Sequence, residues 1–325
     1  MIGHDAEMAS FRGAALSGRL HHAWLLAGPQ GVGKAYFATT AAAWLLAREA
    51  GPNFDLPGFE VPPEHRIAAL LAAGSHPDFR YLARLAKDKS EELARSITVE
   101  QVRGLQSLFA TTPSLSQRRV VVIDAIDDLE RAAANALLKN LEEPPAGTIF
   151  LLVSHAPGRL LPTIRSRCRM LRFARLDEAA TATVLRLALP AADAAEIATL
   201  ARIANGAPGS AIRFAGLDIA GLDAAFERLA LHGDPGNGLR SALARTLALK
   251  AAQPRYEAFL ERAPARIAAA ARAGGARLDE TLALWARARA IADGAIGLSL
   301  NPELTVFELA GLVAKLAPEG VSAKG

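Results

Sequence analysis

A glycine-rich stretch near the N-terminus constrains this chain more than any other feature. Its spacing is G-x-x-x-x-G-K, formed by Gly28, Gly31, Gly33 and Lys34. Glycines at these places let successive backbone N–H groups turn toward one phosphate, and a following helix directs its positive end at the same point. We predict a phosphate-binding loop in which Lys34 reaches the β- and γ-phosphates. A tight glycine turn that binds nothing is the alternative interpretation.

Two parts that normally accompany such a loop are absent. The lysine is followed by Ala35, which offers no hydroxyl oxygen to Mg²⁺ where Ser or Thr is usual. Asp124 ends an apolar run and corresponds to the acid that holds Mg²⁺ in P-loop ATPases. It is followed by Ala125, where a glutamate that activates water is common; losing a general base typically costs about 10²–10⁴ in rate. We therefore expect a nucleotide-type site that does not hydrolyse ATP.

Several nearby groups allow a structural interpretation beside a functional one. Asp127 and Asp128 could replace the missing base, but a solvated turn is favoured. Ser154 ends a predicted strand and is either a phosphate ligand or a simple strand-end hydroxyl. Cys168 is the one cysteine, so an internal disulfide and a multi-cysteine zinc site are excluded, and we expect it to be a small apolar residue. Three tryptophans are predicted to lie in the core: Trp24, Trp44 and Trp285.

Residues 165–169 form a short basic run, Arg-Ser-Arg-Cys-Arg. Such a run is usually a solvated surface. One of its arginines could instead reach the γ-phosphate of a nucleotide bound to a neighbouring subunit. In other nucleotide hydrolases such a contact raises kcat by about 10³–10⁵-fold. A third possibility is a nucleic-acid-binding module built on residues 159–175, which the net charge of +4 permits without arguing for it.

The order of apolar runs predicts the fold. Strand-like runs alternate with helical segments up to about residue 173, which favours a parallel sheet covered on both faces. The expected strands are Ala23–Ala27, Phe79–Leu82, Val120–Asp124, Ile149–Ser154 and Met170–Phe173. Beyond that point every segment reads as helix. We predict an α/β core over 1–173, a small helical domain over 174–218 and a helical bundle over 219–325, with no transmembrane segment or signal peptide and hence a cytoplasmic location.

Several motifs together resemble the clamp-loader branch of the AAA+ proteins. They are His22-Ala23, Gly28–Lys34, His76-Pro77-Asp78, residues 97–103, Ser166-Arg167-Cys168 and, most specific, the run Asn135-Ala-Leu-Leu-Lys-Asn-Leu-Glu-Glu-Pro-Pro145. Within that branch the chain is similar to the delta-prime subunits of bacterial DNA polymerase III. Ala35 and Ala125 fit such a non-hydrolysing member, whereas an active tau/gamma-like ATPase is the alternative.

The resemblance implies a set of further expectations. The three domains would be a P-loop AAA+ core, a helical lid and a collar that joins five subunits. Arg167 would act in trans as an arginine finger on an adjacent tau/gamma site. The implied partners are the tau/gamma and delta subunits, with the sliding clamp and primed DNA reached through the complex and no membrane.

The chain departs from the family at two places. Many relatives carry a four-cysteine zinc module after the P-loop helix, but residues 51–75 contain no cysteine, so we expect neither zinc nor another metal. Active relatives carry a sensor arginine in the lid. Here glycine stands at that position, and Arg213 comes too late to replace it safely. Weak binding of ATP or phosphate is the most that we expect of the loop.

Overall fold

The computed structural model describes residues 1–52, 54–86, 93–213, 215–274 and 277–318. The chain divides into two compact units, Met1–Arg213 and Phe214–Gly325. The second unit begins close to the predicted boundary at residue 219. Whether residues 174–218 form a domain of their own stays a prediction.

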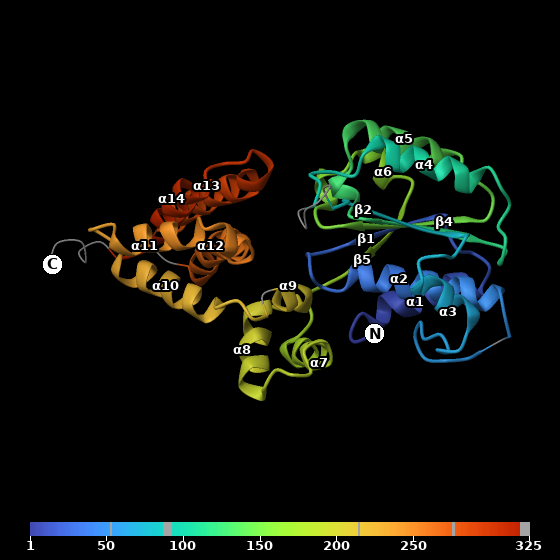
Figure 1. Cartoon of the computed structure of the whole chain (residues 1–325), viewed down its shortest axis with the longest axis horizontal. Coiled ribbons are helices and arrows are strands. Elements are labelled where there is room, and N and C mark those ends of the chain that lie inside the picture. Colours follow the sequence, from blue (N-terminus) through green and yellow to red (C-terminus); the bar gives the residue numbers. More distant parts are fainter. Residues whose placement is uncertain (53, 87–92, 214, 275–276, 319–325) are drawn as a thin grey trace. The chain divides into compact units, whose positions relative to one another are not determined.

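A five-stranded sheet organises the first unit (Figure 1). Its strands lie in the order β2-β3-β4-β1-β5 and every neighbouring pair is parallel. Their bounds are β1 Ala23–Ala27, β2 Phe79–Ala83, β3 Arg119–Asp124, β4 Thr148–Ser154 and β5 Arg169–Arg172. The predicted parallel sheet is therefore confirmed. Every residue of β1 and of β4 is buried, as continuous apolar runs in a doubly covered sheet require.

Helices cover both faces of this sheet (Figure 1). One face carries α1 Asp5–Leu16, α2 Lys34–Glu49 and α3 Arg66–Ala72, and the other carries α4 Val99–Phe109, α5 Arg131–Glu142 and α6 Pro162–Arg165. Single 3₁₀ turns, η1 Ile126–Asp128 and η2 Pro157–Arg159, follow β3 and β4. Because strand side chains alternate, Trp24 packs with Phe11 and Phe37 on the first side while Leu25 packs on the second.

Three short helices complete the first unit: α7 Glu178–Ala188, α8 Ala194–Ala204 and α9 Pro208–Arg213. Asp177 and Asp193 cap the first two, each accepting a hydrogen bond from a backbone N–H of the first turn. Leu185, Ile197 and Leu200 form a small apolar cluster among these helices. The predicted helical segment after the sheet is confirmed.

The second unit is entirely helical among its described residues. It comprises α10 Ile219–His232, α11 Gly238–Leu247, the 3₁₀ turn η3 Lys250–Ala252, α12 Gln253–Ala273, α13 Leu278–Gly297 and α14 Pro302–Ala314. The last helix packs against each of the other four α-helices. Asn301 caps it by accepting from Leu304 N at 3.1 Å, and Pro302 occupies its first turn.

Two of the three predicted core tryptophans are buried, and the third is not. Trp24 and Trp44 are fully enclosed in the first unit. Trp285 is 39% exposed, so its predicted core position is wrong. The reason is that α13 buries small side chains, those of Ala288 and Ala295, where it packs against its neighbours. Trp285 lies on a part of α13 that is not buried in this way.

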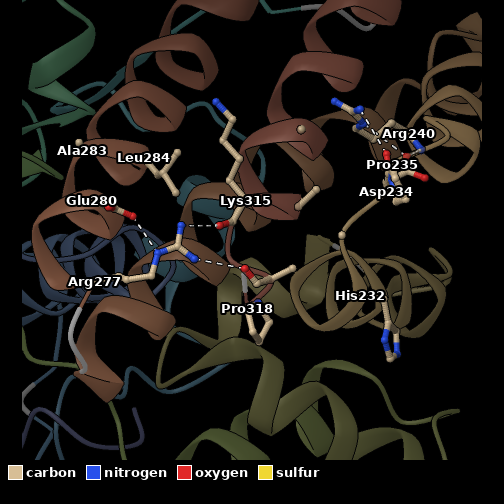
Figure 2. A pocket seen from close by; sticks show the side chains of 14 residues that line it. His232, Asp234, Pro235, Arg240, Arg277, Glu280, Ala283, Leu284, Lys315 and Pro318 are labelled. Atoms are coloured by element: carbon tan, nitrogen blue, oxygen red, sulfur yellow. Dashed lines mark hydrogen bonds and ion pairs between the residues drawn. The ribbon is translucent and has the colours of Figure 1, made fainter. Parts of the chain in front are cut away.

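Figure 2 shows an open pocket in the second unit, of about 760 Å³. Arg277 lies at its edge, pairs with Glu280 at 2.7 Å, and donates to the carbonyl oxygens of Lys315 and Ala317 at 3.3 and 3.2 Å. Those carbonyls follow the end of α14, where a cation is favourable. These contacts of Arg277 thus connect the start of α13 to the end of α14 at the wall of the pocket.

Among the described residues, none of the helices has both the length and the apolar character that crossing a bilayer demands.

The turn before β2 depends on one buried carboxylate. Asp78 is 2% exposed and accepts hydrogen bonds from the backbone N–H groups of Ser114 and Leu115, both at 2.8 Å. It therefore fixes the loop that leads into β3.

We predict that Asp78→Ala lowers the free energy of unfolding of the first unit by about 3 kcal/mol, because two backbone donors lose a charged acceptor. Urea denaturation followed by tryptophan fluorescence in a Trp285→Phe background would report this unit alone. The matched control, Asp55→Ala, removes a carboxylate whose side chain is 99% exposed and should change the value by less than about 0.5 kcal/mol. Equal effects of the two substitutions would contradict the assignment.

Candidate functional site

The glycine-rich loop joins β1 to α2 and has the backbone shape that the motif predicts. Gly31 and Gly33 have φ values of +83° and +104°, which disfavour other residues. A Cβ at Gly28 would lie 2.2 Å from the carbonyl oxygen of Phe173. α2 begins at Lys34, so its N-terminal end directly follows the loop.

Lys34 turns back onto the loop that it follows. Its side chain is buried, and Nζ donates to the carbonyl oxygens of Gly28, at 2.7 Å, and Pro29. Burial lowers the pKa of Lys34 to about 8, although the negative charges of Asp124 and Asp127 act in the opposite direction. The ammonium group therefore already has two acceptors, which leaves one of its three N–H groups for a phosphate.

Two other parts of the first unit hold the loop from outside. In α9, Gly209 N donates to Gly31 O at 2.8 Å, and a Cβ at Gly31 would lie 2.7 Å from both N and Oγ of Ser210. At the N-terminus, His4 Nε2 is 2.9 Å from Val32 O, a distance that fits donation by the ring nitrogen. The loop is thus fixed by hydrogen bonds even without a ligand.

Asp124 lies at the carboxyl end of β3, where parallel α/β sheets bind ligands. Its Oδ2 accepts a hydrogen bond from the Tyr81 hydroxyl at 2.7 Å. Burial and this carboxylate raise the pKa of Tyr81, so the phenol stays a donor. Lys34 follows the carboxyl end of β1 and Asp124 ends β3, so the two residues lie at the same edge of the parallel sheet.

Asp127 is neither the solvated turn residue that the sequence favours nor a free base. Its Oδ1 accepts from Ser154 Oγ at 3.0 Å and from Ala156 N at 3.1 Å, and its Oδ2 accepts from His155 N at 2.7 Å. The carboxylate therefore links the turn after β3 to residues 154–156 at the end of β4. Asp128 instead pairs with Arg84 at 3.1 Å, while burial raises the pKa of its carboxyl group.

His155 belongs to this site and was not singled out from the sequence. Its Nδ1 is buried with no hydrogen-bond partner. Burial lowers its pKa, and the positive charges of Lys34 and Arg213 lower it further, while Asp127 and Asp124 oppose them. The imidazole is therefore neutral near pH 7. The available signal was its place directly after Ser154, at the carboxyl end of a buried strand.

Arg167 lies at the opposite edge of the sheet from the loop. It directly precedes Cys168 and β5, and β5 runs parallel to β1, whose far end leads into the loop. Its Nη1 donates to Thr163 O at 2.9 Å, and its Nη2 pairs with Glu142 Oε1 at 2.8 Å. The structure thus separates Arg167 from Gly28, Gly31, Gly33, Lys34 and Asp124, which it brings together.

The remaining candidates offer no further chemistry. Burial raises the pKa of the Cys168 thiol to about 12, so it is a neutral group rather than a nucleophile. Within the part of the chain that the structure describes, no three His, Cys, Asp or Glu side chains are grouped so as to hold a metal ion. The neighbouring Arg169 lies over the Trp24 ring, 4.9 Å from its centroid.

Comparisons with known proteins agree with the motifs. A family model described as DNA polymerase III, delta subunit, matches residues 3–177. The DNA polymerase III delta' subunit of Pseudomonas aeruginosa is 39% identical over 203 residues, which cover 62% of this chain and 58% of that protein. The delta' subunit of Escherichia coli is 35% identical over 196 residues, 60% of this chain and 55% of that protein.

A gamma subunit is also similar over a shorter stretch. That of Buchnera aphidicola is 34% identical over 162 residues, which cover 50% of this chain and 40% of that protein. In each of these comparisons the chain spans less than two thirds of the relative's length. Because the family model matches more than half of the chain, the chain belongs to the DNA polymerase III delta subunit family, in which it is similar to the delta' subunits.

Proposed function

We propose that this chain is the non-hydrolysing, stator-like subunit of a bacterial clamp loader, where it lends Arg167 to the ATP site of a neighbouring tau/gamma subunit. The observation that carries the proposal is the position of Arg167. It lies at the sheet edge opposite the chain's own loop, so it cannot serve that loop, and its side chain is about one third exposed. An arginine placed in this way suits a site on another subunit.

The loop supports the other part of the proposal, which is that this subunit does not hydrolyse ATP. Ala35 and Ala125 supply neither a metal ligand nor a base, and Asp127 is engaged by Ser154 and two backbone N–H groups. Two of the three N–H groups of Lys34 already donate to carbonyl oxygens of the loop, which leaves one for a phosphate. Any ATP or phosphate that enters would bind weakly, and none of these residues is placed to activate water for attack.

An apolar surface on the second unit supports assembly with other subunits. Leu278, Leu282 and Trp285 recur along α13 at i, i+4 and i+7, and they are 41%, 45% and 39% exposed. This spacing places the three on one face of the helix. We propose that this face packs against the collar of a neighbouring clamp-loader subunit, which also accounts for the exposed Trp285.

The remaining partners follow from that assembly. The proposed complex contains tau/gamma and delta subunits and reaches the sliding clamp and primed DNA in the cytoplasm. An active tau/gamma-like ATPase is less supported, because the delta' relatives are more similar over a longer stretch than the gamma relative and because Ala35 and Ala125 lack the required groups. A DNA-binding module based on residues 159–175 is also less supported, since Arg167 and Arg169 already contact Glu142 and Trp24.

We predict that the isolated chain shows no ATP turnover above that of its Lys34→Ala variant. The physical reason is the lack of a metal ligand at Ala35 and of a base at Ala125. Phosphate release measured over many hours with Mg²⁺ checks this. Sustained hydrolysis that disappears in the Lys34→Ala variant would reject the stator proposal.

We predict that Arg167→Ala abolishes clamp-stimulated hydrolysis at the neighbouring site of the reconstituted complex, by about 10³-fold or more, while the subunits still assemble. Steady-state ATPase with clamp and primed DNA measures the rate, and gel filtration measures assembly. The control is Arg165→Ala, which removes an exposed arginine from the same basic run and should leave the rate unchanged. Normal turnover with Arg167→Ala would count against the trans role.

We predict that Trp285→Ala combined with Leu282→Ala weakens co-purification with partner subunits at least tenfold, because the exposed apolar face of α13 shrinks. Circular dichroism would show that the helical content is unchanged. Leu187→Ala is the control, since this α7 side chain is 73% exposed and lies in the other unit. Undiminished assembly of the double variant would place the interface elsewhere.

A further inference from the structure

Glu142 is the acidic partner of Arg167 and has no role in the proposal so far. It is the last residue of α5, and its Oε1 lies 2.8 Å from Arg167 Nη2. A second acceptor, Thr163 O on α6, takes a hydrogen bond from Arg167 Nη1 at 2.9 Å. The guanidinium group therefore lies between acceptors from two different helices.

Both acceptors stand on well-anchored backbone. Next to Glu142, Leu141 is 1% exposed and its carbonyl oxygen accepts from His22 Nε2 at 3.1 Å. Next to Thr163, Ile164 is 1% exposed within the core on the same face of the sheet. α5 and α6 also pack against each other. The two backbone positions that carry the acceptors are thus held in place, and the two contacts together restrict how the guanidinium can turn.

The ion pair contributes little to the stability of the fold. The side chain of Arg167 is 34% exposed and that of Glu142 is 48% exposed, and pairs so open to water are weak. A guanidinium has five N–H groups, and the two acceptors leave three of them for a further ligand. The contacts therefore need not be broken when Arg167 meets a phosphate.

We propose that Glu142 is a positioning residue for Arg167: with the Thr163 carbonyl, it orients the guanidinium group toward the phosphates of a nucleotide bound to the neighbouring subunit. This inference rests on the proposed function. Orientation matters because a small displacement of a group that stabilises the transition state costs up to about 10²-fold in rate. Glu142 itself touches no nucleotide.

The test uses the reconstituted complex with hydrolysing neighbours, clamp and primed DNA. Glu142→Ala should lower kcat by about 10- to 100-fold with KM for ATP unchanged, because the oriented arginine acts on charge that develops in the transition state. Glu142→Gln keeps an acceptor oxygen at the same distance along the side chain and should retain more of the rate. Glu143→Ala is the matched control, since Glu143 is an exposed neighbour at the end of the same helix.

Three results would overturn the proposal. An increased rate with Glu142→Ala would mean that the carboxylate restrains Arg167 rather than orienting it. An unchanged rate, or a loss shared by Glu143→Ala, would mean that Glu142 has no specific role. Equal losses with Glu142→Ala and Glu142→Gln would assign the effect to charge alone. The melting temperature and the gel-filtration profile of each variant should match those of the parent.

A double variant separates this inference from the proposed function. If Glu142 acts through Arg167, adding Glu142→Ala to Arg167→Ala should cause no further loss. If Arg167→Ala leaves the rate unchanged, the trans role itself fails. If Arg167→Ala abolishes the rate and Glu142→Ala does not lower it, only the positioning role fails.

Discussion

The parallel pairing of the five strands decides where the functional groups described in the first unit lie. Strands that run in one direction bring their carboxyl ends to a single edge, so the glycine loop, Asp124 and Ser154 meet there although they are far apart in the sequence. The same pairing sends the segment before β5 to the opposite edge, together with Arg167. One hydrogen-bonding pattern therefore produces both a nucleotide-type loop and an arginine separated from it.

The groups around the loop bind one another. Lys34 donates to carbonyls of its own loop, Asp127 accepts from the last residue of β4 and the two residues after it, and Gly31 accepts from Gly209. In an active nucleotide site such groups would be kept for phosphate and metal. Here they are used in internal contacts, in agreement with the loss of side-chain chemistry at residues 35 and 125.

Much of the fold could be predicted because it depends on local pattern. The strand-like runs in the sequence correspond to the five strands of the sheet. The motif residues Gly28 to Lys34 likewise predicted the loop. What could not be predicted depends on contacts between distant segments. Asp127 accepts hydrogen bonds from residues at and after the end of a different strand, and His155 is distinguished only by the charges near it. Trp285 is exposed because alanines occupy the positions through which α13 packs against its neighbours.

The hydrogen bond from Gly209 to Gly31 has a mechanical consequence. Since a Cβ at Gly31 would lie 2.7 Å from both N and Oγ of Ser210, α9 is in close contact with the loop and holds its backbone in one conformation. A ligand that required α9 to leave the loop would have to break this contact, and the free energy of that change would be subtracted from its affinity. In the proposed complex, such a contact would let this subunit keep its local shape while the nucleotides on neighbouring subunits change.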